Sequence, residues 1–197
     1  SEVDLSHKEY NLRVTDLSVK VPGGFLEITR RYEAGRWVLD HNRFRLVPKC
    51  LDVPHCTTLL GMVLNGAEYE KVGWDEGLFV RETSQITRDH QERYTWKDKA
   101  GNWVILRGDR QLEAFGNRGG LLGRYLYTTG PYPRVTGVED RNGRQVFWFD
   151  YNEGSRGPSA VRDLAGRRVE YGYLEGLLRS VRDVSGNVTS YSYDSAG

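Results

Sequence analysis

The sequence lacks any apolar run close to the roughly 20 residues that a membrane-spanning helix requires. It also lacks an excess of charge of either sign, because 28 Lys and Arg residues against 27 Asp and Glu residues give a formal net charge of +1. A chain this close to neutral has no electrostatic basis for binding nucleic acid or an anionic membrane surface. We therefore expect neither a membrane span nor a nucleic-acid partner.

Catalytic motifs are missing as well. The four histidines lie outside the sequence contexts typical of metalloproteases, serine hydrolases and cysteine nucleophiles; they are His7, His41, His55 and His90. No glycine-rich loop stands between a strand pattern and a helix pattern, as phosphate binding would require. We expect no catalytic residue, no cofactor and no metal, and so no enzyme. A hydrolase whose catalytic residues come from distant parts of the chain is the remaining alternative.

Cysteine is scarce, and the two cysteines flank one short segment that contains Pro54 and His55. Because Cys50 and Cys56 lie in the same predicted connection, a disulfide that closes this loop is the first interpretation. Such a bond would need an oxidising compartment. Two free thiols are the second interpretation. A metal site of Cys50, His55 and Cys56 is the third, and it has no fourth ligand nearby in the sequence.

Aromatic residues and glycine, in contrast, are plentiful. Aromatic residues make up 12% of the chain, with 12 Tyr among them, and there are 23 Gly. Aromatic and β-branched side chains suit the half-buried surface of a strand, and glycine supplies the turns that many short strands need. The composition predicts an all-β fold.

A short motif recurs in the C-terminal half. Within residues 98–186, four segments have the form Asp-x-x-Gly, and a degenerate copy lies at 117–120. Asp at the first turn position accepts backbone N–H bonds, and Gly at the fourth adopts positive φ without a steric clash. The predicted turn residues are Asp98, Gly101, Asp140, Gly143, Asp163, Gly166, Asp183 and Gly186.

An aromatic strand pattern follows each turn, and a shorter strand pattern precedes it. Aromatic residues two positions apart point to the same face of a strand. The aromatic positions are Tyr125, Tyr127, Phe147, Phe149, Tyr151, Tyr171, Tyr173, Tyr191 and Tyr193. Because a single hairpin is marginal in water, the units must pair edge to edge to bury this face. Tandem antiparallel hairpins that form a coiled β-sheet are therefore predicted.

Two other interpretations of these residues stay open. The Asp-x-x-Gly segments are alternatively calcium loops, although each offers one carboxylate where calcium loops supply several oxygen ligands. Tyrosine pairs such as Tyr171 and Tyr173 are alternatively a stacking surface for sugars, although the same spacing is usual for packing inside a sheet. We favour turns and packing.

The N-terminal half carries further strand patterns. An apolar run at 59–64 leads into Asn65–Gly66, which is a strong hairpin signal, and the chain returns through 67–72. Residues 77–81 form another candidate strand. A helix within 57–64 is the alternative, because periodicity does not decide over so short a window. Residues 87–93 are charged and are expected to be solvated.

The repeats resemble a known family. The segments 166–173, 180–186 and 191–194 are similar to tandem YD repeats of bacterial Rhs proteins, which are related to Tc-toxin C components and teneurins. The resemblance covers about residues 96–197. Residues 16–32, with Trp37 and His41–Asn42 after them, resemble the segment that precedes the repeats in this family.

This resemblance implies a spiralling β-sheet that at full length forms a hollow shell. In the family, the shell encapsulates or displays a C-terminal effector or toxin domain, and the protein is secreted or exposed at the cell surface. We expect an N-terminal β segment at 1–95 and tandem repeats, cut within a repeat, at 96–197. The expected function is a non-catalytic structural scaffold. The alternative is an adhesive β module that binds a glycan or a protein.

The end of the chain and its sheet edges lead to expectations about partners. The sequence stops at 194–197 within a repeat, so we expect a fragment of a longer protein. The Asp-Pro-x-Gly self-cleavage motif that ends the shell in the resembling family does not occur, so autoproteolysis is not assigned to this chain. Its partners would be further repeats and a C-terminal effector. Unpaired edges promote association, and we expect concentration-dependent self-association by strand addition.

Overall fold

The computed structural model describes residues 12–42, 45–52, 54–74 and 77–193. Regular structure there consists of strands and one short 3-10 turn, η1 (Asp40–Asn42), so the all-β prediction is confirmed. The strands are β1 (Arg13–Val21), β2 (Gly24–Glu33), β3 (Arg36–Leu39), β4 (Leu46–Cys50), β5 (Leu59–Leu64), β6 (Ala67–Lys71), β7 (Leu78–Arg81), β8 (Ser84–Arg88), β9 (Tyr94–Asp98), β10 (Trp103–Leu106), β11 (Leu112–Asn117), β12 (Gly120–Tyr127), β13 (Val135–Asp140), β14 (Gln145–Asp150), β15 (Ala160–Asp163), β16 (Arg168–Leu174), β17 (Leu177–Arg182) and β18 (Val188–Ser190). Among the described residues, no helix is long and apolar enough to cross a membrane.

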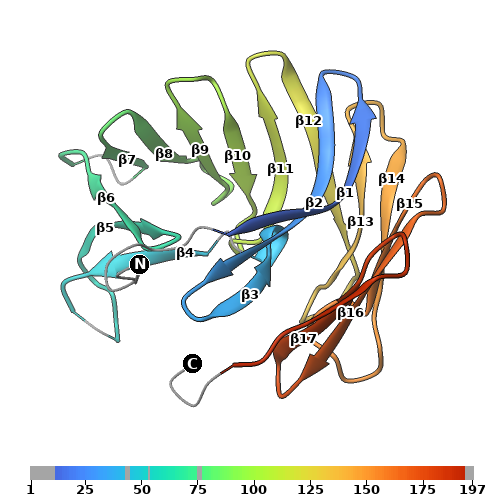
Figure 1. Cartoon of the computed structure of the whole chain (residues 1–197). Helices are drawn as coiled ribbons and strands as arrows, with labels where there is room; N and C mark the ends of the chain where they lie inside the picture. The colour runs from blue at the N-terminus through green and yellow to red at the C-terminus, as the bar shows by residue number, and fades with distance from the viewer. Residues whose placement is uncertain (1–11, 43–44, 53, 75–76, 194–197) are drawn as a thin grey trace, which may run out of the picture. The chain divides into compact units, whose positions relative to one another are not determined.

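The strands form two antiparallel sheets. β1, β2 and β3 make a three-stranded sheet, and β4 to β18 make a fifteen-stranded sheet in which each strand pairs with its neighbours in the chain (Figure 1). In such a meander, successive connections lie alternately at one end of the strands and at the other. The sheet begins at β4, so strands from the segment preceding the predicted repeats belong to the same sheet as the repeats. The expected domain boundary at residues 95 and 96 falls inside β9 and stays a prediction.

Local turn chemistry explains the tight hairpins. Asn65 and Gly66 have φ of 52° and 81°, as a two-residue type I′ turn requires. Glu175 and Gly176 repeat this geometry between β16 and β17, with φ of 54° and 78°. The strand expected at 59–64 is β5, and its alternative as a helix is wrong.

The chain divides into two compact units. The central unit comprises residues 19–26 and 41–148, and every strand from β4 to β11 contributes a buried side chain to one apolar cluster. Full burial of one such side chain stabilises the fold by about 1.5–3 kcal/mol. The cluster consists of Leu46, Met62, Leu64, Tyr69, Phe79, Ile86, Tyr94, Val104, Leu106 and Leu112.

The terminal unit comprises the described residues of 1–18, 27–40 and 149–197. It contains β3 and β15 to β18, and β3 lies against β17. Its buried apolar residues come from both sheets; they include Ile28, Leu39, Val161, Val169, Leu178 and Val181. The three-stranded sheet therefore shares a core with the last repeats.

Two local expectations are corrected, and a third is borne out. The strand expected at 188–193 ends at Ser190, although the Tyr191 N–H still donates to the Arg179 carbonyl at 2.8 Å. The degenerate copy at 117–120 closes with Asn117 paired directly to Gly120, which makes a two-residue turn. The charged stretch at 87–93 is solvated as expected, with His90 to Arg93 exposed, and it contains the hairpin turn between β8 and β9.

Candidate functional site

The Asp140 turn shows how the recurring motif closes a hairpin. The backbone N–H groups of Asn142 and Arg144 donate to Asp140 Oδ1 at 2.9 and 3.1 Å, and Arg144 Nε donates to Oδ2 at 3.2 Å. The Gly143 N–H donates to the Asp140 carbonyl at 3.0 Å. Gly143 has φ of +77°, where a side chain would be strained. The turn itself thus uses both carboxylate oxygens.

The other three motif copies use the same geometry. In each, the N–H of the residue four positions after Asp donates to Oδ1 at 2.9 Å, and the side chain of that residue donates to Oδ2. The three pairs are Asn102 with Asp98, Arg167 with Asp163, and Asn187 with Asp183. The structural motif is therefore Asp-x-x-Gly followed by Arg or Asn, and the sequence reasoning missed its fifth position.

A further copy lacks glycine and was also missed. Asp89 accepts bonds from the N–H groups of Gln91 and Arg93 at 2.9 Å and from Arg93 Nε at 3.0 Å. Glu92 takes the glycine position with φ of +62°. The signal that would have found this turn is the Arg four residues after the Asp.

These hydrogen bonds favour the charged form of the turn carboxylates. At Asp140, burial raises the pKa, but the N–H groups of Arg144 and Asn142 outweigh it, so the pKa lies below its ordinary value. At Asp183 and Asp98, the side-chain amides of Asn187 and Asn102 are the main cause of a lowered pKa. The carboxylates act as fixed acceptors in their own loops.

The calcium interpretation finds no support in this geometry. Each carboxylate is committed to N–H donors of its own turn, whereas a calcium site needs several oxygen ligands directed at one point. Among the residues that the structure describes, no group of three or more His, Cys, Asp or Glu is placed to hold a metal ion.

The predicted aromatic positions differ in burial. Phe147, Phe149 and Tyr171 are buried. The other six are half-buried; they are Tyr125, Tyr127, Tyr151, Tyr173, Tyr191 and Tyr193. The hydroxyls of Tyr127 and Tyr193 each donate to a backbone carbonyl fifteen residues earlier, of Leu112 and Leu178. These aromatic side chains contribute to packing between strands.

A buried ion pair lies at the centre of the terminal unit. Arg30 Nε of β2 donates to both carboxylate oxygens of Asp16 on β1 at 3.0 and 3.1 Å, and the two side chains are 7% and 5% exposed. The Tyr171 hydroxyl of β16 donates to Asp16 Oδ2 at 2.8 Å. Burial and the Asp16 charge raise the pKa of Tyr171 well above its ordinary value, so the hydroxyl remains a donor. Asp16 thereby joins the three-stranded sheet to a repeat tyrosine.

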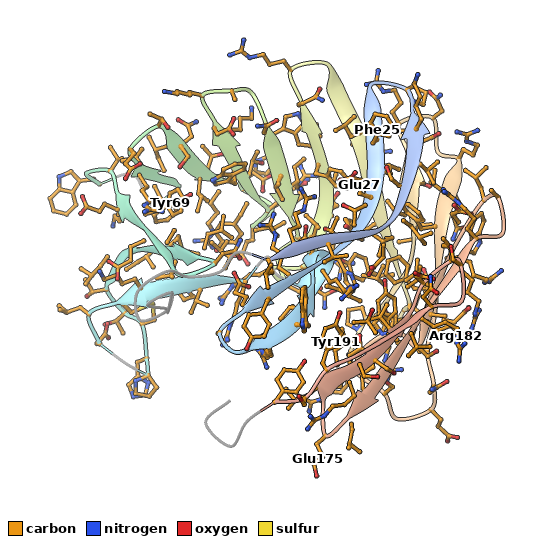
Figure 2. The ribbon with its side chains drawn as sticks, in the orientation of Figure 1. Phe25, Glu27, Tyr69, Glu175, Arg182 and Tyr191 are labelled. Carbon is orange, nitrogen blue, oxygen red and sulfur yellow. A yellow bond between two sulfur atoms is a disulfide. The ribbon has the colours of Figure 1, made fainter. Side chains whose placement is uncertain are left out.

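Aromatic rings cover the other side of this arginine. The Arg30 guanidinium lies 5.0 Å from the Trp37 ring centroid and 5.6 Å from that of Tyr191. Tyr191 (labelled in Figure 2) also lies 5.3 Å from Trp37, centroid to centroid. Cation–π contacts of desolvated arginine contribute about 2 kcal/mol. We call Asp16, Arg30, Trp37, Tyr171 and Tyr191 the Arg30 cluster.

A motif arginine adds a second link between the two sheets. Arg167, the fifth residue of the Asp163 turn, donates through Nη2 to the Ser18 carbonyl of β1 at 2.9 Å. Its Nε is bonded to Asp163, whose side chain is fully buried. The turn motif therefore helps to hold β1 as well as closing its own hairpin.

The two cysteines lie at the ends of a compact loop between β4 and β5. The structure joins Cys50 and Cys56 by a disulfide, with a Cα–Cα distance of 5.1 Å. Asp52 accepts bonds from the N–H groups of Thr57 and Thr58 at 2.9 Å and from the Thr57 hydroxyl. These bonds, the Thr57 hydroxyl first, lower the pKa of Asp52 to about 2. Asp52 is a loop-closing residue that the sequence reasoning missed.

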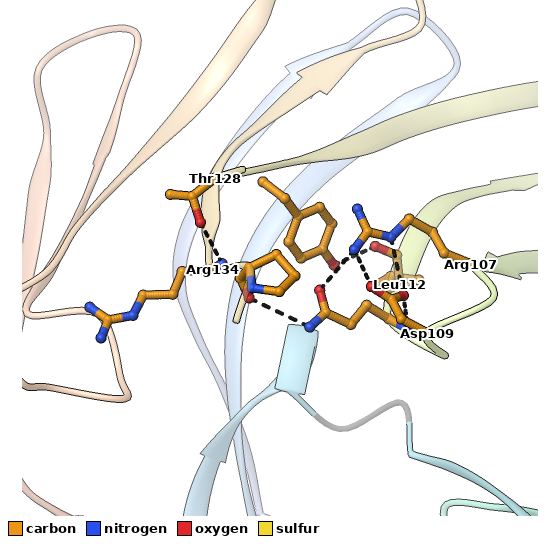
Figure 3. A network of polar contacts seen from close by, with 8 residues as sticks. Arg107, Asp109, Leu112, Thr128 and Arg134 are labelled. Carbon is orange, nitrogen blue, oxygen red and sulfur yellow. Dashed lines mark hydrogen bonds and ion pairs between the residues drawn. The ribbon is translucent and has the colours of Figure 1, made fainter. Parts of the chain in front are cut away.

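The central unit contains an open polar groove. Figure 3 shows polar contacts in this region, among them those of Arg107 with Asp109. The groove has a volume of about 840 Å³, and strands β11 to β13 and their connections contribute to its lining. Arg107 donates to Asp109, and this bond raises the pKa of Arg107. The Arg107 guanidinium carbon lies 4.5 Å from the Tyr127 ring centroid. Opposite charges balance across the lining, which includes Arg93, Arg107, Arg124, Asp109, Glu113 and Glu139.

The histidines are not gathered in this groove. His55 and His90 are exposed in separate connections. The His41 ring lies 6.2 Å from the Tyr125 ring, centroid to centroid. His7 lies outside the described residues. The described histidines thus belong to three separate places in the chain.

Part of the chain matches a described protein family. The family described as RHS Repeat matches residues 174–197. Within it, the described residues contain the end of β16, the type I′ turn, β17, the Asp183 turn and β18, which together make one repeat unit. No curated protein matches the chain.

Proposed function

We propose that the chain, whose residues 174–197 match the family described as RHS Repeat, is a non-catalytic structural scaffold. Its sheet would enclose or display a C-terminal effector domain of a longer, exported protein. The observation that carries the proposal is the use of the recurring residues. The motif carboxylates close their own turns, as at Asp140 and Asp183, and buried aromatics such as Phe147 pack the sheet.

Export agrees with the cysteine pair. A disulfide between Cys50 and Cys56 persists in oxidising surroundings such as the periplasm or the cell exterior. We therefore place the scaffold outside the cytoplasm, either secreted or at the cell surface.

Limited proteolysis of the native gene product tests the scaffold function. We expect a segment beyond residue 197 that resists protease while the sheet is folded and is digested once Arg30→Met loosens the terminal unit. An exposed control, Arg162→Met, should leave this segment protected. Equal digestion in the unmodified protein and in Arg30→Met would contradict enclosure, and enzymatic turnover by the unmodified chain would contradict a non-catalytic role.

A second candidate function is glycan binding, and the groove of the central unit is the observation that favours it. Balanced donors and acceptors beside Tyr125 and Tyr127 suit a neutral, hydroxyl-rich ligand. Tyr171 is 4% exposed, so its ring is not available at the surface for sugar stacking.

A glycan array separates the two functions. Saturable binding that Arg124→Ala abolishes and Arg162→Ala preserves would support recognition at the groove. Arg124 lines the groove, whereas Arg162 pairs with Asp150 in the terminal unit. Absence of retained glycans would leave the scaffold as the sole function proposed.

A further inference from the structure

The outer edge of β4 is built differently from the rest of the sheet. β4 is the last strand of the fifteen-stranded sheet, and among the described residues only β5 pairs with it. An unpaired strand edge presents N–H and C=O groups that another strand can bind. The direction of each backbone group in β4 therefore decides whether this edge accepts a partner.

The register with β5 fixes these directions. The Asn65 N–H donates to the Arg45 carbonyl at 3.1 Å, and the next pairs are Leu46 with Leu64 and Val47 with Val63. In an antiparallel ladder, hydrogen-bonded and non-hydrogen-bonded pairs alternate. Since residues 45 and 65 are bonded, Val47 and Lys49 direct their backbone groups to β5. Leu46 and Pro48 direct theirs to the open edge.

Proline at the second outward position removes a donor. Pro48 has no N–H, so of the two outward positions in the regular part of β4 only Leu46 keeps both a donor and an acceptor. The register then shifts between Lys49 and Cys50, and the disulfide loop begins at Cys50. Proline and a β-bulge are known ways in which edge strands avoid pairing, and the loop that starts at Cys50 ends the strand beside them.

We infer that the outer edge of β4 is a built-in stop that prevents a second copy of this chain from adding a strand there. A second copy is the relevant partner because its own β4 presents the same outward positions, and an antiparallel β4–β4 pair is self-complementary. Pro48 removes one donor from each chain in that pair. This stop limits the self-association expected from open edges, and it does not depend on the effector or on export.

Amide exchange at Leu46 reports on this edge directly. In the wild-type chain, the exchange rate of the Leu46 N–H measured by NMR should be the same in dilute and concentrated samples. In Pro48→Val, which restores the outward donor, the Leu46 N–H should exchange about tenfold more slowly in the concentrated sample. Pro131→Val, which changes a proline in the connection between β12 and β13, should behave as wild type.

Each outcome decides the inference. Concentration-dependent protection of Leu46 in the wild-type chain would overturn it, and this measurement does not require any variant to fold. Unchanged Leu46 exchange in a folded Pro48→Val chain would overturn it as well, because the missing donor would then not be what prevents pairing. Protection in Pro48→Val alone would establish that Pro48 closes the edge.

Discussion

Asp140 and Asp183 make the same turn in different surroundings. The Asp140 side chain is 1% exposed, whereas Asp183 lies at the surface. Replacing either carboxylate removes acceptors from two backbone N–H groups. Water can replace the carboxylate as the acceptor only at the exposed turn, so the same substitution lowers the free energy of unfolding by different amounts at the two turns.

We therefore expect Asp140→Ala to lower the free energy of unfolding by about 1–3 kcal/mol. The matched variant Asp183→Ala should lower it by clearly less, because its freed N–H groups become hydrated. Urea denaturation followed by tryptophan fluorescence measures both. Equal losses would show that the buried carboxylate is not needed to satisfy its turn.

Arg110 occupies a left-handed position that suits glycine. Its φ is +64°, and a non-glycine residue in this conformation destabilises the fold by roughly 1 kcal/mol. Arg110→Gly should raise the free energy of unfolding by a few tenths to about 1 kcal/mol, after the larger entropy of glycine in the unfolded chain is taken into account. Arg110→Ala retains the strain and should give no gain. A gain of the same size in Arg110→Ala would point to the side chain and not to the backbone.

The lowered pKa of Asp52 makes the stability of the fold depend on pH. Its pKa is about 2 in the folded chain against 3.8 ordinarily, so folding favours its carboxylate. The resulting stabilisation is complete above the unfolded pKa and is lost as the pH falls from about 4 through 2. The difference in Tm between the wild-type chain and Asp52→Asn should shrink across this window. A difference that is constant from neutral pH to pH 2 would contradict the assignment.

At the scale of elements, the Arg30 cluster joins β1 and β2 to β16. Removing one partner of a buried ion pair leaves the other charge uncompensated, at a cost of about 3–5 kcal/mol. We expect a loss of this size in Arg30→Met, which leaves the buried Asp16 carboxylate without its ion-pair partner. Arg162→Met breaks an exposed pair with Asp150 and should cost about 0–1 kcal/mol. Chemical denaturation compares the two, and similar losses would argue against a structural role for the cluster.

The hairpins were predictable because their signals are local. Asn65–Gly66 and the four Asp-x-x-Gly segments specify turns within a few residues, and the structure contains hairpins at each of them. The Asp89 turn escaped prediction because Glu92 replaces the glycine. The contact between Asp16 and Tyr171 spans 155 residues, and no local pattern encodes it. The separate three-stranded sheet was missed for the same reason.

At the scale of the whole molecule, sequence repetition and sheet order agree. A meander that adds neighbouring strands in chain order needs only the same turn and the same apolar face in each unit. The turn residues and most aromatic positions serve this construction, which is why the repeats support an architecture more strongly than an activity. The family match at 174–197 coincides with one such unit.

Amide exchange across the repeat turns tests the central claim most directly. If the motif carboxylates build turns, then the N–H groups of Asn142, Arg144 and Arg167 exchange slowly in the absence of any metal, and calcium leaves their rates unchanged. If the motifs are ligand loops, these N–H groups exchange rapidly until calcium is added and become protected only then. We predict the first result, and the second would contradict the scaffold account.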